Sequence, residues 1–458
     1  MDAITLADAG QNAALLTEKD ANCVSGSSVT PGCPQEGQQK GPQKGPQKGT
    51  ELFEDAVVSL SNAILSLEPS PTLSASQRAN ELKALGKDII SLTVGEPDFE
   101  TPQHIKDAAA DAMKKGYTRY TAVAGILPLR HAISEKLQRD QHLVFPPSQV
   151  VVTNGGKQAL AAACAVLLNP GDEAVIPAPY WTSYPDMVKL TGAKPVIVHG
   201  RAENGYVLTG EELLKACTPR TKVIFLNTPS NPTGACYTEA QLQDWRKALS
   251  TLKNKDQIVI LSDEVYEYIT YDDFKHVSFA TIAPEFRENT LVVNAFSKTY
   301  AMTGWRVGYV AGPKHIISAI ETHQSQFTSN VCSIAQYAAA KAYEDGGAFP
   351  KQMQEEFSRR LDFLCEAAAN IKGVRLVRPK GAFYGFFEID QLLGKRAGSV
   401  TIDSGLALTR YLLEEFDVAV VQGEAFGAPA AFRISFALGT SALSRALQRI
   451  TDAIAKLK

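Results

Sequence analysis

Two cationic side chains, Lys298 and Arg306, lie in the segment 294–309, which reads Asn-Ala-Phe-Ser-Lys-Thr-Tyr-Ala-Met-Thr-Gly-Trp-Arg-Val-Gly-Tyr. An apolar run at 291–293 predicts a buried strand that stops at Ser297 and Lys298, at the edge where ligands gather in open α/β sheets. A lysine that can lose its proton, close to a fixed cation, suits a Schiff base beside a phosphate. The alternative is two solvated surface charges. The neighbours of Lys298 are small or hydroxylated residues, whereas a surface lysine is usually surrounded by Glu and Gln. This composition favours the interpretation as a Schiff-base site.

A second phosphate-binding element is predicted at 150–168. A short strand at 150–153 precedes Asn-Gly-Gly-Lys, and a helix is expected over 158–168. A glycine turn between a strand and a helix N-terminus directs free amides and the helix dipole at an anion. Gly155, Gly156 and Lys157 are therefore candidates for the same phosphate site as Arg306. A nucleotide-binding P-loop is excluded because its first glycine and its terminal Lys-Ser/Thr are missing.

Two further candidates follow predicted strands and could contact a flat ring. Trp181 comes after the strand 173–176 and could stack on such a ring; the alternative is a core aromatic. Asn231 lies in Asn-Thr-Pro-Ser-Asn-Pro-Thr-Gly after the strand 222–226. Two prolines fix that loop, so the Asn231 amide is held where it can donate to a phenolic oxygen.

Asp263, Tyr266 and Arg433 complete the set of candidate residues. Asp263 follows the strand 258–261, and a carboxylate beneath an aromatic nitrogen keeps that nitrogen protonated. Tyr266 could donate to a ring hydroxyl. The alternative for Asp263 is a helix cap. Arg433 interrupts an apolar strand at 432–436, where its planar fork would suit a carboxylate, unless it forms a structural salt bridge.

The segment around Lys298 resembles the lysine segment of class I pyridoxal-phosphate (PLP) aminotransferases. Its form is typical of the subgroup with bacterial aspartate aminotransferases and plant glutamate/aspartate-prephenate aminotransferases. The motifs Gly-Glu-Pro-Asp-Phe at 95–99, Asn-Pro-Thr-Gly at 231–234 and Asp-Glu-x-Tyr at 263–266 extend the resemblance from Leu67 to the C-terminus. It does not cover residues 1–50.

The resemblance implies PLP as cofactor, with Lys298, Asp263 and Tyr266 as catalytic residues. The residues that it implies for cofactor binding are Gly155, Gly156, Lys157, Trp181, Asn231, Asp263, Tyr266, Ser297, Lys298, Arg306 and Tyr120. Those that it implies for substrate binding are Gly95, Trp181, Asn231, Arg433, Lys157 and Thr72. The family's role for Tyr120 is to reach the phosphate of the neighbouring subunit's cofactor, which implies a homodimer; otherwise Tyr120 is a surface tyrosine. One departure is Ala295, where many relatives have a phosphate-binding Ser.

The implied reaction is transamination between aspartate and 2-oxoglutarate, with prephenate as a further substrate. Thr72 and Lys157 match positions that recognise the distal acidic group, whereas Glu68 stands where some relatives have Lys. One rival is an alanine or aromatic aminotransferase, or a β-lyase, on the same fold. Another is a catalytically silent binding module, which would predict loss of Lys298 or Asp263. Both residues are present.

The repeated order of strand, site residue and helix over 150–310 predicts an α/β layer with a mostly parallel sheet. The resemblance implies the type I PLP-dependent transferase fold, with seven strands in the large sheet and a smaller α+β domain. The expected parts are a disordered extension (1–50), an N-terminal arm with part of the small domain (51–103), the large domain (104–349) and the small domain (350–458). Within the arm, a helix is expected at 51–67 and a strand at 88–94.

Composition narrows the partners and the compartment. The chain of 458 residues has a net charge of −3 and no apolar run near membrane-spanning length, so neither nucleic acid nor membrane is expected. Seven scattered cysteines without C-x-x-C spacing indicate a reducing compartment, and no metal-ligand spacing is visible. The extension has several acidic residues and no Arg, unlike a transit peptide. Cytoplasm is expected, with plastid as the alternative because the plant relatives are plastidic.

Overall fold

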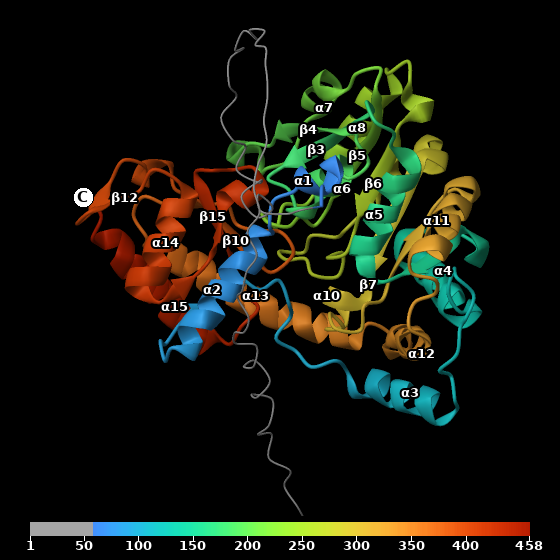
Figure 1. The fold of residues 1–458 in the computed structure, drawn as a ribbon, viewed down its shortest axis with the longest axis horizontal. Coiled ribbons are helices and arrows are strands. Elements are labelled where there is room, and N and C mark those ends of the chain that lie inside the picture. The colour runs from blue at the N-terminus through green and yellow to red at the C-terminus, as the bar shows by residue number, and fades with distance from the viewer. Residues whose placement is uncertain (1–57) are drawn as a thin grey trace, which may run out of the picture. The chain divides into compact units, whose positions relative to one another are not determined.

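A seven-stranded sheet forms the centre of the computed structural model, which describes residues 58–458 (Figure 1). These residues belong to one compact unit, Gly49–Lys458. In spatial order the strands are β2 (Val150–Thr153), β8 (Gly308–Ala311), β7 (Thr290–Ala295), β6 (Val259–Asp263), β5 (Thr221–Asn227), β3 (Glu173–Ala178) and β4 (Lys194–His199). Strand β8 is antiparallel to β2 and β7, and the other pairs are parallel. The prediction of a mostly parallel sheet is confirmed.

Helices cover both faces of this sheet, as alternating side chains of the strands require. On one face, Val151 and Val293 belong to a core packed by α5 (Gly155–Leu167), α6 (Ser183–Lys189) and α11 (Lys314–Phe327). Their neighbours Val152 and Val292 belong to the core on the opposite face. That face is covered by α4 (Leu127–Gln141), α12 (Ser333–Ala342), α7 (Gly210–Ala216), α8 (Glu239–Ser250) and α9 (Phe279–Ile282), and α3 (Gln103–Lys114) packs on α12. Because both faces are buried, the strands read as continuous apolar runs.

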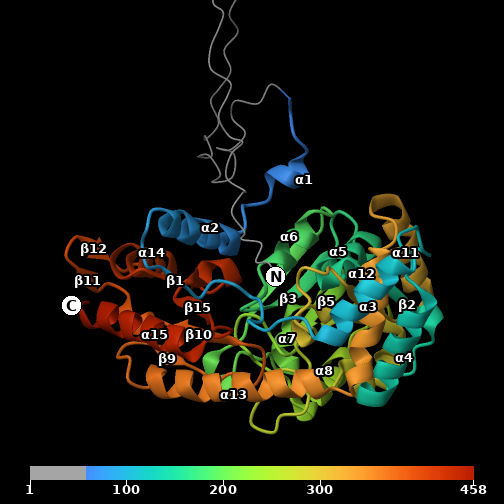
Figure 2. The same ribbon diagram turned by 90° about the horizontal axis from the view of Figure 1, so that it is seen from below.

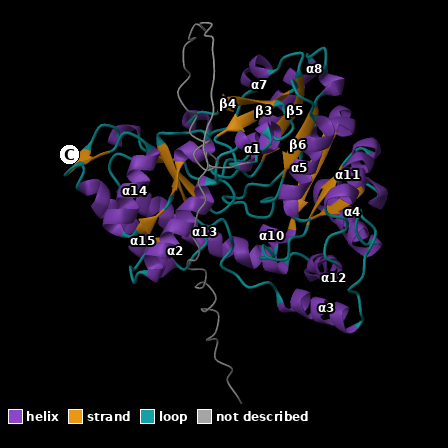
Figure 3. Ribbon diagram, in the orientation of Figure 1, coloured by secondary structure: helices purple, strands orange, loops and turns teal. Residues whose placement is uncertain are grey.

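A smaller antiparallel sheet lies beside the large one, in the order β14 (Val421–Gln422), β15 (Ala431–Ser435), β10 (Tyr384–Glu388) and β9 (Arg375–Leu376) (Figure 3). Two short pairs flank it, β1 (Ile90–Ser91) with β13 (Val418–Ala419) and β11 (Arg396–Ala397) with β12 (Val400–Thr401). Its helices are α2 (Pro71–Ala84), α14 (Gly405–Phe416) and α15 (Thr440–Ala455). The long helix α13 (Ala348–Ala368) runs beneath both sheets (Figure 2). The predicted smaller α+β region is therefore present.

Local boundaries differ from the sequence predictions in the N-terminal part. Of the helix expected at 51–67, residues 51–57 lie outside the described part of the chain, as does the extension 1–50. Within 58–67 the structure has the single turn α1 (Asn62–Leu65). The strand expected at 88–94 contains only Ile90 and Ser91, because β13 offers only two residues as a partner. Within residues 58–458, no helix is long and apolar enough to cross a bilayer.

Candidate active site

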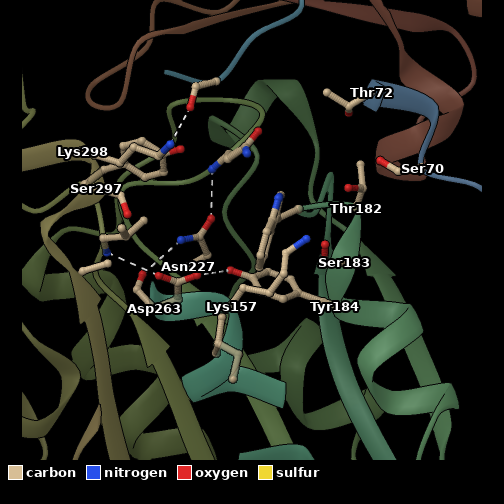
Figure 4. A pocket seen from close by; sticks show the side chains of 18 of the residues that line it. Ser70, Thr72, Lys157, Thr182, Ser183, Tyr184, Asn227, Asp263, Ser297 and Lys298 are labelled. Atoms are coloured by element: carbon tan, nitrogen blue, oxygen red, sulfur yellow. Dashed lines mark hydrogen bonds between the residues drawn. The ribbon is translucent and has the colours of Figure 1, made fainter. Parts of the chain in front are cut away.

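A cavity of about 380 Å³ opens at the carboxyl ends of the parallel strands (Figure 4). Its floor and walls come from the segments that follow β2, β3, β5, β6 and β7, and β10, β15 and the start of α2 close its other side. This edge is where the strand–loop–helix pattern was expected to gather ligand-binding residues. The predicted residues that line it are Gly95, Gly156, Lys157, Trp181, Asn231, Asp263, Tyr266, Ser297, Lys298, Arg306, Arg433 and Thr72.

Lys298 lies in the single-turn helix α10 (Phe296–Thr299), directly after β7. The strand ends at Ala295, earlier than predicted, so Lys298 is presented from a helical turn. Its Nζ donates a 2.5 Å hydrogen bond to the carbonyl oxygen of Gly95. Burial lowers the pKa of Lys298 to about 8; the Glu96 carboxylate opposes this shift, and the Arg306 guanidinium adds to it. A lysine with this pKa can lose its proton near neutral pH, as a nucleophile or base must.

Asp263 is the last residue of β6 and is buried. Tyr184 donates a 2.6 Å hydrogen bond to its Oδ2, and the Val265 amide donates to Oδ1 at 3.3 Å. Burial raises the pKa of Asp263 to about 6, and the Tyr184 hydrogen bond limits this rise. The segment after Asp263 is a series of turns, so the alternative of a helix cap is wrong. A buried carboxylate of this kind is suited to hold a cationic aromatic nitrogen.

Arg433 is buried in β15, with 2% of its surface exposed. Its guanidinium donates to Asn231 Oδ1 at 2.9 Å and to the Thr93 carbonyl oxygen at 2.7 Å, while its Nε has no partner in the described structure. Among residues 58–458 no carboxylate pairs with Arg433. The alternative of a structural salt bridge is therefore wrong within this part of the chain. The cation is left available for an anion that enters the cavity.

The predicted phosphate site lies where the end of β2 meets the beginning of β8, the strand with which it pairs. Helix α5 begins at Gly155, not at Gln158 as predicted, so both glycines belong to its first turn, where backbone amides lack helical partners. Gly155 has φ +75°, and a Cβ there would overlap the Arg306 guanidinium. A Cβ on Gly308 would lie 2.6 Å from the Gly156 nitrogen. Arg306 itself has φ +54°, and a strained backbone at such a position is typical of a functional site.

Lys157 and Trp181 face each other at one wall of the cavity. The Lys157 Nζ lies 5.0 Å from the centre of the Trp181 ring. Burial lowers the pKa of Lys157, Arg306 lowers it further, and the Asp186 carboxylate opposes both. Figure 4 shows Ser70 and Thr72, at the start of α2, across the cavity from Lys298. The lining therefore combines the Lys157 cation and the hydroxyl groups of Ser70 and Thr72 with the carboxylates of Glu68 and Asp186.

Two predicted residues stand apart from the lining. Gly155 lies behind the lining residue Arg306 and packs against its guanidinium, as described above. Tyr120 is 91% exposed and is not among the lining residues of this chain. An exposed tyrosine agrees with either of its two interpretations, a surface residue or a contact with a second subunit.

Comparison with known proteins decides the family. The family model "Aminotransferase class I and II" matches residues 87–450. The chain belongs to this family. It is 46% identical to an aspartate aminotransferase of Geobacillus stearothermophilus, over 86% of this chain and 98% of the relative. It is 47% identical to an aspartate/prephenate aminotransferase of Cereibacter sphaeroides, over 85% and 97%.

The solved structure of an aspartate aminotransferase from Rhizobium meliloti superposes on this chain with a TM-score of 0.84. Its sequence identity is 42%, and the match covers 88% of this chain and all of that one. The expected type I PLP-dependent transferase fold is confirmed, and so is the expectation of an aminotransferase. The cofactor of the class I family is PLP.

The residues of the cavity fit PLP. The glycine cradle at the start of α5, with Arg306 beside it, offers amides and a cation to a phosphate. Asp263 and the Trp181 ring offer a carboxylate and a flat apolar surface to an aromatic ring, and Lys298 offers an amine to an aldehyde. Ala295 at the end of β7 contributes no hydroxyl to this set.

Two tyrosines at the site were missed by the sequence analysis. Tyr184 reaches Asp263 from α6, and the Tyr384 hydroxyl lies 2.8 Å from that of Tyr266. Tyr184 could have been noticed as the second aromatic after Trp181 in the same loop-and-helix segment. Tyr384 comes from the smaller sheet, more than a hundred residues from Tyr266, and no local pattern marks it.

A group of potential metal ligands lies outside the cavity, although no metal-ligand spacing was visible in the sequence. Atoms of Glu264, Glu267 and His276 lie within 4.8 Å of one another. The carboxylate of Glu267 already pairs with Lys136 and accepts from Asn294 at 2.6 Å. Two serine hydroxyls donate to Glu264. These partners give the group a structural explanation without a metal.

Proposed function

We propose that the protein is an aspartate aminotransferase, which interconverts L-aspartate and 2-oxoglutarate with oxaloacetate and L-glutamate. The observation that carries the proposal is the presence of cations at separate places in one cavity. Arg433 is buried without a carboxylate partner in the described structure, and Lys157 lies on the wall with Trp181. Two cations flanking Lys298 suit a substrate with a carboxylate at each end. The aspartate aminotransferases among the relatives described above support the same substrate.

PLP, when bound, withdraws electrons from the Cα of an amino acid and so makes its proton acidic. Lys298 is the base proposed to take that proton and return it, since a pKa of about 8 allows it to lose its own proton near neutral pH. Asp263 would keep the ring nitrogen protonated, and Tyr266 and Asn231 would address the ring oxygen. Arg433 would orient the α-carboxylate, with the loop at Gly95 beside it.

The remaining cavity residues have proposed roles that follow from their positions. Gly155, Gly156, Ser297 and Arg306 would hold the phosphate, and Trp181 would stack on the ring. Lys157 and Thr72 would contact the distal carboxylate. A lysine is a point charge on a flexible stem, so it can follow distal acids of different reach better than a rigid Arg fork.

Prephenate is a second proposed substrate, because one relative is an aspartate/prephenate aminotransferase. Glu68 lines the cavity, and its charge would oppose a substrate with two carboxylates. Aspartate also carries two carboxylates, so Glu68 opposes both substrates, and prephenate, a 2-oxo acid, would serve as an amino-group acceptor. Rates with aspartate, glutamate, alanine, phenylalanine and cysteine as donors, each with 2-oxoglutarate and prephenate as acceptors, test the assignment. A preference for alanine or phenylalanine, or release of ammonia from cysteine, would point to the rival enzymes.

The proposed assembly is a homodimer in which Tyr120 reaches the cofactor phosphate of the second subunit. Its 91% exposure leaves it free for such a contact. The proposed domain limits are 51–103 and 350–458 for the arm and the small domain, and 104–349 for the large domain. The proposed compartment is the cytoplasm, with the plastid as the alternative. Imaging of the full chain fused at its C-terminus to a fluorescent protein would distinguish the two compartments.

A further inference from the structure

Tyr384, the first residue of β10, connects three parts of the site. It lines the cavity although only 1% of its surface is exposed. Its hydroxyl oxygen lies 2.8 Å from that of Tyr266, and the Arg433 guanidinium lies 4.4 Å from the centre of its ring. The strand register explains the second contact. Tyr384 pairs with Ser435 in β15, and Arg433 is two residues away on the same face.

The Tyr384 hydroxyl also lies against the loop at Gly95, whose carbonyl oxygen accepts the Lys298 hydrogen bond. A Cβ on Gly95 would lie 2.5 Å from that oxygen, so only glycine permits this approach. The Gly95 carbonyl accepts from Lys298, and the nearby Thr93 carbonyl accepts from Arg433. Tyr384 therefore contacts Arg433, Tyr266 and the backbone beside Lys298 at once.

The direction of the bond between the two hydroxyls matters, because each carries one hydrogen. If Tyr266 donated to Tyr384, its proton would be engaged between the two hydroxyls and would not be available to a group inside the cavity. If Tyr384 donates, the Tyr266 proton is free for a group inside the cavity. A hydroxyl that accepts one hydrogen bond is also a stronger donor in the next.

We propose that Tyr384 is a positioning residue of the reaction: its hydroxyl donates to Tyr266 and so directs the Tyr266 proton into the cavity, while its ring holds the Arg433 guanidinium in place. The inference rests on the proposed function for the role of Arg433 as carboxylate clamp. The part that concerns Tyr266 depends only on the cofactor of the family.

The test uses the cofactor-loaded enzyme and two variants. Tyr384→Phe keeps the ring and removes the hydroxyl, whereas Tyr384→Leu removes both. The absorbance of the bound cofactor changes with pH as the cofactor loses a proton. A residue that donates a hydrogen bond to the deprotonated ring oxygen stabilises the deprotonated form, so a weaker donor moves the midpoint of this titration to higher pH. Tyr384→Phe should raise the titration midpoint by about 0.2–0.5 pH unit. Binding of succinate, a dicarboxylate without an amino group that serves as an unreactive substrate analogue, should keep its Kd within about twofold. Tyr384→Leu should also weaken succinate binding by about tenfold.

The matched control is Tyr411→Phe, which removes a hydroxyl from another buried tyrosine of the same core cluster and should change neither quantity. Tyr266→Phe should shift the titration further, and Tyr266→Phe/Tyr384→Phe should match Tyr266→Phe alone. Tyr384→Phe leaves the buried Tyr266 hydroxyl without its partner, which could impair folding. The double variant removes both hydroxyls, so it can still be compared with Tyr266→Phe if Tyr384→Phe folds poorly. A wild-type titration in Tyr384→Phe, or full additivity in the double variant, would overturn the inference. Because the titration needs no substrate, failure to transaminate aspartate would refute the proposed function separately.

Discussion

The hydroxyl of Tyr184 donates a 2.6 Å hydrogen bond to Oδ2 of Asp263, and both side chains are buried. The Tyr184 ring is fixed between Phe225, at 4.7 Å between ring centres, and Trp181, at 5.4 Å. The residue proposed to stack on the cofactor ring is thus connected, through one tyrosine, to the carboxylate proposed to hold its nitrogen. Removal of the hydroxyl should disturb the carboxylate without emptying the space.

Tyr184→Phe is predicted to shift the pH dependence of cofactor uptake by the apoenzyme. Asp263 has a pKa of about 6, and the Tyr184 hydrogen bond lowers that pKa. Uptake should require the ionised carboxylate, so it should fall as the pH drops through this pKa. Loss of the hydrogen bond raises the pKa, so the fall should move to higher pH by about one unit. Fluorescence quenching on addition of PLP, followed from about pH 5 to about pH 8 so that the range brackets both titrations, measures the shift.

The control for this variant is Tyr237→Phe, which also removes one hydrogen-bonded hydroxyl from a buried tyrosine. Its partner is the Leu208 amide at 3.0 Å, in the core on the other side of the sheet. The uptake profile of Tyr237→Phe should match the wild-type profile. A Tyr184→Phe profile that also matches would mean that Asp263 does not control uptake through its charge.

Lys298→Ala is predicted to abolish transamination while the protein stays folded. In the described structure the Lys298 side chain makes one hydrogen bond, to the Gly95 carbonyl, so removal of this side chain should lower the free energy of unfolding only slightly. Loss of the base should lower kcat by at least about 10²–10⁴-fold. Borohydride reduction of the loaded wild-type enzyme, followed by peptide mapping, should label Lys298. A label on any other lysine would show the assignment to be wrong.

The chemistry at strand ends was predictable because it is encoded locally. Lys298, Asp263 and Asn231 each follow an apolar run and stand in a short string of fixed composition. Their convergence follows from the rule that parallel strands present their carboxyl ends at one edge. The mostly parallel sheet was predictable for the same reason, whereas its seven strands were implied by the resemblance to class I PLP aminotransferases.

The contacts between distant segments were not predictable. Tyr384 meets Tyr266 only after the smaller sheet packs against the large one. Arg433 meets the Thr93 carbonyl only because the segment after β1 lies along β15, more than 300 residues later in the chain. The start of α5 was placed late because a glycine pair usually indicates a turn, whereas here the phosphate cradle is the first turn of the helix itself. Asp263 was open to a capping role because the sequence does not reveal that turns follow it.

Lys136→Met is predicted to destabilise the protein through a buried ion pair. Lys136 is fully buried and pairs with the Glu267 carboxylate, which also accepts from Asn294. Asn294 in turn accepts from the Ala295 amide at the end of β7, close to Lys298. Loss of the lysine leaves a buried carboxylate without its cation, which should lower the free energy of unfolding by about 3–5 kcal/mol. Urea denaturation measures the change.

A double variant and an exposed pair are the controls for that measurement. Lys136→Met/Glu267→Gln removes both charges and should recover a large part of the lost stability. Lys215→Met breaks the exposed pair of Lys215 with Glu211 and should cost less than about 0.5 kcal/mol. Equal losses in Lys136→Met and Lys215→Met would contradict a buried role for Lys136.

Hybrid dimers are predicted to recover activity if Tyr120 acts across subunits. Tyr120→Ala and Lys298→Ala should each be poorly active alone. In a dimer of one copy of each, one site carries both defects and the other carries neither. A refolded equimolar mixture should then reach roughly a quarter of wild-type activity, since half of its dimers are hybrids with one intact site. No recovery, with mixed dimers present by native mass spectrometry, would place Tyr120 outside the shared site.

Lys157→Met is the variant that decides the substrate side chain. Lys157 projects over Trp181 and lies on the cavity wall with Ser70 and Thr72, so it could serve either the distal carboxylate or the phosphate cradle at the start of α5. Met keeps the length of the side chain and removes the charge. If the cation contacts the distal carboxylate, kcat/KM for aspartate should fall by about 10–100-fold, whereas kcat/KM for alanine, which has no distal acid, should change less than about threefold. If Lys157 serves only the phosphate, both substrates lose equally and the apoenzyme binds PLP more weakly. Steady-state kinetics with both donors, together with PLP titration of the apoenzyme, separate these outcomes.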